Sequence, residues 1–119
     1  LLAVDESLGT ILAAIDGLGE LDNTVVVVTS DHGIWYGEHG LSNERRLSYE
    51  EALRIPMMIR FPGRIPAGTR PGQMVLSLDI APTMLDLAGE TPPGDLHGMS
   101  LVPILEGLDP EWRSCFLGV

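Results

Sequence analysis

Residues 24–33 read Thr-Val-Val-Val-Val-Thr-Ser-Asp-His-Gly, a β-branched run that ends in an acid, an imidazole and a glycine. Four consecutive valines have no polar face, so we expect a strand covered on both sides, as in a largely parallel sheet. Asp31 and His32 then emerge at the carboxyl edge of that strand. Open α/β sheets bind their ligands in the crevice beyond such strand ends. The segment therefore predicts a ligand or metal site at this edge.

The residues that follow carry many ionisable groups. An aspartate after a strand often only caps a helix or forms a turn, and a lone histidine is usually a hydrogen-bonded structural residue. The concentration of polar chemistry in the next twenty residues favours function instead, because a connecting loop needs far less of it. The side chains concerned are His39, Arg45, Arg46, Tyr49, Glu50 and Glu51.

Composition limits the possible functions. The chain has 119 residues, 45% of them hydrophobic, which is enough for one domain with a core. Its net charge is −10 and all seven basic residues are arginines, so we expect no nucleic-acid partner. No apolar stretch is long enough to cross a bilayer. The single cysteine, Cys115, cannot form an internal disulfide, and we expect it to be buried filler.

Hydrophobic periodicity predicts alternating helices and strands. A stripe of apolar residues predicts a helix over 1–18, ended by Gly17 and Gly19. The other expected elements are the valine strand, a functional loop over 34–48, a short helix over 47–53, a strand over 57–61, a short strand over 74–76, a helix over 80–87, a brief helix over 101–105 and a strand starting near 113. Asp79 is expected to cap the helix over 80–87. The alternation favours an α/β fold with a mostly parallel sheet flanked by helices.

Five segments, taken in order, carry a family resemblance. They are Thr29–Gly33, Gly37–Leu41, Tyr49–Pro56, Asp79–Thr83 and His97–Leu101, which read TSDHG, GEHGL, YEEALRIP, DIAPT and HGMSL. In this order and spacing they resemble the later part of the sulfatase family, within the alkaline phosphatase superfamily. The resemblance implies an alkaline-phosphatase-like α/β fold. It makes residues 1–119 the later part of a sulfatase catalytic domain, truncated at both ends.

The same resemblance implies a chemistry. Such enzymes hydrolyse sulfate esters with a divalent metal, usually calcium, and a formylglycine nucleophile made from a cysteine. Cys115 lacks the modification signal that would follow such a cysteine. We therefore expect the nucleophile and the first metal-binding acids upstream of Leu1, and residues 1–119 alone to be inactive. Members of the family are often exported, which suggests a periplasmic or secreted protein.

The resemblance also implies residue roles. Asp31 is a metal ligand, and His32 is either a second ligand or an acid toward the leaving oxygen of the substrate. His39 belongs either to the active-site rim or to a structural hydrogen-bond network. Counting back from Tyr49, Arg45 stands where sulfatases commonly have a sulfate-binding lysine. An arginine suits a tetrahedral anion but never titrates, so Arg45 is a clamp rather than a proton donor.

Two alternatives stay open. A phosphoryl or phosphonate ester hydrolase of the same superfamily, typically with zinc or manganese, also uses an Asp-His-Gly corner. The second alternative is a non-catalytic relative that keeps the fold, since the usual lysine is absent. Within the short helix over 47–53, we expect Glu51 to pair with Arg54.

Overall fold

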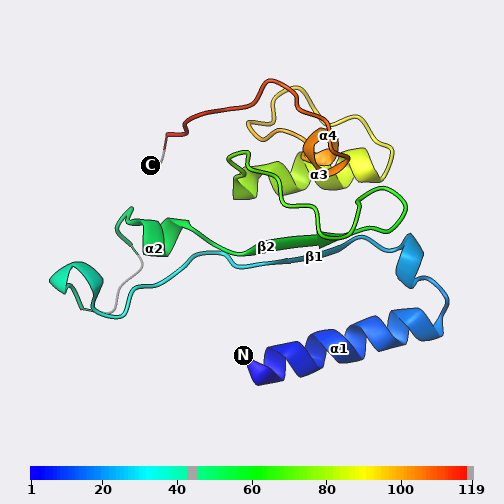
Figure 1. Ribbon diagram of the computed structural model, residues 1–119, viewed down its shortest axis with the longest axis horizontal. Helices are drawn as coiled ribbons and strands as arrows, with labels where there is room; N and C mark the ends of the chain where they lie inside the picture. The colour runs from blue at the N-terminus through cyan, green and yellow to red at the C-terminus, as the bar shows by residue number, and fades with distance from the viewer. Residues whose placement is uncertain (43–45, 118–119) are drawn as a thin grey trace.

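The computed structural model describes residues 1–42 and 46–117. In chain order its elements are α1 (Leu2–Gly17), η1 (Leu21–Asn23), β1 (Val26–Thr29), η2 (Glu38–Gly40), α2 (Glu50–Leu53), β2 (Met57–Arg60), η3 (Ser77–Asp79), α3 (Ile80–Leu87) and α4 (Val102–Leu105). The strand pair occupies the centre, with α1 on the β1 side and α3 and α4 on the β2 side (Figure 1). The predicted helix before the valine strand and the helix over 80–87 are confirmed.

Strands β1 and β2 lie side by side, as predicted, but they run antiparallel. Val26 pairs with Arg60 and Thr29 with Met57. The parallel arrangement expected from the sequence is therefore wrong for this pair. A parallel pair needs a crossover that carries the chain back along the sheet. The described part of the connection instead stays at the end where β1 finishes, with η2 and α2 there, so the chain re-enters the sheet from the same end (Figure 1).

The valine strand is less covered than its composition predicts. Val25–Val28 are half-buried rather than enclosed on both faces. Helix α1 stands apart from β1 in Figure 1, and none of its residues is buried. Its apolar stripe, including Val4 and Ile11, stays largely exposed. None of the helices in the described ranges combines the length and apolarity that a bilayer crossing demands.

The carboxylate of Asp79 anchors the other side of the molecule. It is fully buried, and Arg113 donates to it twice, at 2.5 and 2.7 Å. The backbone N–H groups of Leu76 and Met99 also donate to it, each at 2.8 Å. Asp79 occupies the N-cap position of α3, as predicted, but its side chain makes no capping hydrogen bond to that helix. It ties three segments together instead.

Residues 98–101 lie along η3 and α3. Gly98 approaches so closely that a Cβ there would stand 2.0 Å from the carbonyl oxygen of Leu78. The buried hydroxyl of Thr83 accepts a hydrogen bond from the backbone N–H of Leu101 at 2.8 Å. Leu101, Val102 and Ile104 are buried beyond this contact and supply most of the apolar core among the described residues.

Two predicted strands and one predicted burial are wrong. Residues 74–76 and 113–117 form no strand. The carbonyl of Met74 accepts a hydrogen bond from Trp112 Nε1 at 2.7 Å, a side-chain contact in place of a ladder. Short strands are stable only beside partner strands. Residues 114–117 are exposed, so Cys115 is exposed rather than buried filler.

The Asp79–Arg113 pair makes stability depend on pH. Burial by itself raises the pKa of the Asp79 carboxyl. The hydrogen bonds from Arg113, Met99 and Leu76 and the charge of Arg113 outweigh it, so the pKa lies below its ordinary value of 3.8. The ionised carboxylate therefore stabilises the fold above 3.8, and this contribution is lost as the pH falls through the lowered pKa.

We expect Asp79→Asn to lower the unfolding free energy at neutral pH by on the order of 3 kcal/mol, because the Arg113 charge loses its partner. The gap between the native and variant proteins should shrink as the pH falls below 3.8. Denaturant titrations over a pH series measure this. Asp95→Asn, at an exposed aspartate, is the matched control and should leave the native curve unchanged. A difference in unfolding free energy between the two proteins that stays constant down to acid pH would contradict the role of the ionised Asp79 carboxylate.

Candidate functional site

The candidate site begins where β1 ends. Thr29 closes the strand, and its hydroxyl donates to the carbonyl of Pro56 at 2.9 Å. Asp31 and His32 follow on an exposed corner at the same end of the sheet as α2 (Figure 1). The structure thus brings together the two residues predicted as metal ligands, at the predicted strand end.

The Asp31 carboxylate is held ionised. The backbone N–H of His32 donates to Asp31 Oδ1 at 3.0 Å. This hydrogen bond, and next the charge that the His32 ring carries when protonated, lower the pKa of the carboxyl below its ordinary value of 3.8. The side chain is 85% exposed, so its oxygens remain accessible. An ionised, accessible carboxylate is the donor that a hard cation prefers.

The ring of His32 is oriented by its own neighbour. Nδ1 lies 2.8 Å from the carbonyl oxygen of Gly33, and a carbonyl can only accept, so Nδ1 carries the hydrogen. In the neutral ring Nε2 then holds the lone pair. Nε2 lies 3.6 Å from Asp31 Oδ2, too far for a hydrogen bond but close enough for both atoms to face one ion. Holding one ring nitrogen on a carbonyl is how metal-binding histidines are commonly fixed.

Gly33 joins this corner to α2. Its N–H donates to the carbonyl of Ala52 at 2.8 Å. A Cβ on Gly33 would stand 2.0 Å from the carbonyl oxygen of Glu51, so no larger residue fits without displacing backbone. In the sequence, Gly33 stands out only as the last residue of the Asp-His-Gly motif. The spacing between motifs carries no signal for this contact, which is the reason it was missed.

His39 lies in a second cluster, beside α2, together with Tyr49 and Glu51. Its backbone is left-handed, with φ 58°, which is uncommon for a residue other than glycine. The ring stacks on Tyr49 with centroids 4.1 Å apart, and Nε2 lies 3.1 and 3.2 Å from the two oxygens of Glu51. The predicted Glu51–Arg54 pair is therefore wrong. Arg54 pairs with Glu50 at 3.2 Å, because Glu51 is turned toward His39.

Trp35 gives the loop a small core of its own. The side chain is fully buried and its Nε1 donates to the carbonyl of Ser42 at 2.9 Å. The Tyr49 ring meets it edge to face, with centroids 5.6 Å apart. The sequence pattern did not mark Trp35 as a core residue. The loop is thus packed from within, which holds His39 and Glu51 in place.

The other predicted site residue, Arg45, lies outside the described residues. The described part of the chain holds no group of three or more histidine, cysteine, aspartate or glutamate side chains that could bind a metal together. Asp31 and His32 fit a divalent ion as two neighbouring donors, one carboxylate and one imidazole. Two donors are too few for a calcium ion, which takes six to eight oxygen ligands, so the corner fits part of a metal site.

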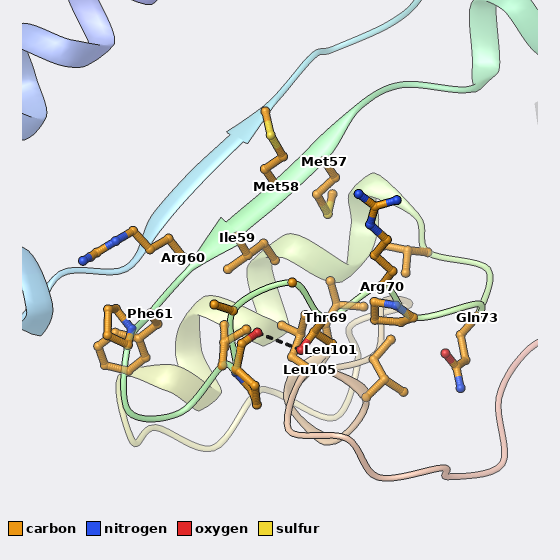
Figure 2. Close-up of a pocket in the computed structure, with 18 of the residues that line it drawn as sticks. Met57, Met58, Ile59, Arg60, Phe61, Thr69, Arg70, Gln73, Leu101 and Leu105 are labelled. Atoms are coloured by element: carbon orange, nitrogen blue, oxygen red, sulfur yellow. Dashed lines mark hydrogen bonds between the residues drawn. The ribbon is translucent and has the colours of Figure 1, made fainter.

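A separate cavity of about 1190 Å³ lies between β2, the loop over 62–73 and α4 (Figure 2). Met57, Ile59 and Leu105 are among the residues that line it. Of the described residues that line it, none is acidic and none is a histidine. Asp31, His32 and His39 are not part of its wall. The cavity is therefore distinct from the candidate site.

Comparison with solved structures gives the class of the fold. The chain aligns with a protein solved in complex with its substrate D-glucosamine-2-N,6-O-disulfate, at a TM-score of 0.87 and 45% identity, over 94% of this chain and 23% of that one. It also aligns with the phosphonate monoester hydrolase of Agrobacterium radiobacter, at a TM-score of 0.83 and 37% identity, over 92% and 22%. The fold is alkaline-phosphatase-like, as predicted.

The family follows from the sequence matches. Residues 37–117 match the family described as "N-sulphoglucosamine sulphohydrolase, C-terminal". The N-acetylglucosamine-6-O-sulfatase of Bacteroides thetaiotaomicron is 47% identical over 115 residues, which are 94% of this chain and 20% of that protein. The chain belongs to the sulfatase family, in its carboxyl-terminal portion. It spans about a fifth of the length of this relative.

We expect Gly33→Ala to lower the unfolding free energy by about 1–3 kcal/mol, because the new methyl group must push α2 away from the corner. Denaturant unfolding measures the change. Gly94→Ala is the matched control, since a Cβ at Gly94 meets nothing within 4 Å. Equal losses of stability in the two variants would show that the close approach at Gly33 is unimportant.

Proposed function

We propose that residues 1–119 are the later part of a sulfuric ester hydrolase. One observation carries the proposal: the ionised Asp31 carboxylate and the oriented His32 ring share an exposed strand-end corner, 3.6 Å apart, in a chain of the sulfatase family. A fold by itself does not define an activity, so the proposal depends on these two side chains.

A divalent metal, with calcium as the first choice, is the proposed cofactor. Asp31 would offer it a carboxylate oxygen, and His32 the Nε2 lone pair that the Gly33 carbonyl leaves available. When bound, the metal would neutralise negative charge on the oxygens of the ester. The further ligands and the formylglycine nucleophile are expected upstream of Leu1.

Three residues act on the substrate in this proposal. Arg45 holds the sulfate through its planar guanidinium and stabilises the charge of the reacting group. Because Arg45 does not titrate near neutral pH, the proton for the leaving oxygen must come from elsewhere, and His32 is the candidate acid if it is not a ligand. His39 lines the substrate pocket at its rim.

The proposed substrate is a sulfated amino sugar. The relative that is 47% identical is an N-acetylglucosamine-6-O-sulfatase, and the structure at 45% identity holds a sulfated glucosamine. These similarities support a sugar sulfate over a simple aryl sulfate as the natural ester. No membrane or nucleic-acid partner is proposed, and export to the periplasm or outside the cell stays a prediction.

A phosphonate monoester hydrolase is the second candidate. Two observations favour it: the alignment with the Agrobacterium enzyme at 37% identity, and the lack of any lysine in this chain. An imidazole beside a carboxylate also suits zinc or manganese better than it suits calcium. A relative without catalysis is the third possibility, since the lysine common in sulfatases is missing.

The full-length protein that contains this chain should hydrolyse 4-nitrophenyl sulfate faster than a matched aryl phosphonate. Asp31→Asn should lower this activity at least about 100-fold, because a metal ligand is lost. Chelation should abolish the activity and calcium should restore it, whereas Asp95→Asn, at an exposed residue away from the corner, serves as the control. Preference for the phosphonate, or restoration by zinc alone, would favour the second candidate.

Purified residues 1–119 should show no turnover of an aryl sulfate, because the nucleophile and the remaining metal ligands are expected elsewhere in the protein. The comparison is with the full-length protein at equal molar concentration. Measurable hydrolysis by the isolated chain that Asp31→Asn removes would overturn the proposed division of the site.

A further inference from the structure

Glu51 and His39 form a pair whose purpose the proposed reaction does not explain. Both carboxylate oxygens of Glu51 lie within 3.2 Å of the same ring nitrogen, Nε2 of His39. The Tyr49 ring covers one face of the imidazole at 4.1 Å. The His39 side chain nevertheless stays 40% exposed. The ring is thus held at one nitrogen and on one face while the rest of it faces outward.

The backbone contact between Gly33 and α2 fixes Glu51 relative to the corner formed by Asp31 and His32. The carbonyl of Glu51 lies against Gly33, the residue after His32. The carbonyl of Ala52 accepts a hydrogen bond from the Gly33 N–H at 2.8 Å. A shift of α2 would therefore move Glu51 and the corner together. Through Glu51, His39 is positioned relative to Asp31 and His32 although it lies further along the chain, in η2.

The contact also decides which ring nitrogen carries the hydrogen. An ionised carboxylate can only accept, so Nε2 of His39 must donate to Glu51. The backbone N–H of Glu51 and then the His39 ring lower the pKa of the Glu51 carboxyl, which favours the ionised form. In the neutral imidazole, Nδ1 then keeps its lone pair. No other hydrogen bond engages the His39 ring within residues 1–42 and 46–117.

We propose that Glu51 is a positioning residue that fixes the orientation and tautomer of His39, so that Nδ1 accepts a hydrogen bond from a hydroxyl group of a sugar-like substrate. The inference rests on the proposed function, because it needs a polyhydroxylated ester as substrate. It goes further by assigning Glu51 a role and by naming the substrate group that His39 recognises. A purely structural Glu51 would hold the loop without affecting substrate affinity.

Kinetics of the full-length protein on a sulfated glucosamine test the proposal. Glu51→Ala and His39→Ala should each raise KM roughly 10-fold with kcat nearly unchanged, the effect of one lost hydrogen bond that ground and transition states share. The double variant should be no worse than His39→Ala, because Glu51 acts only through His39. Glu50→Ala is the matched control, since Glu50 is on the same helix and pairs only with the exposed Arg54 among the described residues.

A spectroscopic arm does not depend on turnover. Nitrogen-15 NMR of protein labelled at histidine, with the His39 signals assigned by their loss in His39→Ala, should show the Nε2–H tautomer in the native protein. Glu51→Ala should populate the Nδ1–H tautomer, and Glu50→Ala should not. If Glu51→Ala fails to fold, Glu51→Leu keeps most of the side-chain volume and removes the hydrogen-bond acceptor.

The outcomes separate the two proposals. An unchanged tautomer in the Glu51 variants, or additive effects of Glu51→Ala and His39→Ala on KM, would overturn the role of Glu51. A native protein that turns over neither sulfate nor phosphonate esters overturns the proposed function, and with it the recognition of a substrate hydroxyl. A change of tautomer in Glu51→Ala, together with non-additive effects of the Glu51 and His39 variants on KM, supports both the role of Glu51 and the proposed function.

Discussion

The antiparallel pairing of β1 with β2 is the constraint on which the candidate site depends. The ladder ends at Thr29 opposite Met57, and the hydrogen bond from Gly33 to Ala52 continues the contact beyond the strands. Because a Cβ on Gly33 would collide with the backbone of Glu51, only glycine allows this approach. The pairing therefore delivers Asp31 and His32 to one side of the contact, and α2 with Glu51 and its partner His39 to the other.

The segments that carry the sulfatase resemblance prove to be contact partners. The Asp-His-Gly corner packs on the Tyr-Glu-Glu helix, and the segment around Gly98 packs on the segment around Asp79. In the second case a buried carboxylate and Arg113 hold the contact, so four hydrogen bonds converge on one side chain. These motifs thus lie where two backbone segments touch in the folded chain. This gives the family pattern a physical meaning beyond its use for identification.

The corner that holds Asp31 and His32 is open to solvent within the described residues. Asp31 is largely exposed, and its ionised carboxylate has one neighbouring donor, the His32 ring. The valines of β1 are half-buried and the apolar stripe of α1 is uncovered. An active site needs water to be excluded around the reacting group. These open surfaces belong to a chain that spans about a fifth of the length of a curated relative.

Local sequence was sufficient for the helices, the two strands β1 and β2, the strand-end position of Asp31 and His32, and the family, because each follows from periodicity or from a contiguous motif. Local sequence was insufficient where a contact joined residues that are distant in the chain. The direction of β2 and the partner of Glu51 were predicted wrongly, and the contact of Asp79 with Arg113 was not predicted, since charge and spacing within one element cannot reveal a partner on another. Only the tertiary structure decided these, because burial and backbone contact select one partner among several chemically equivalent ones.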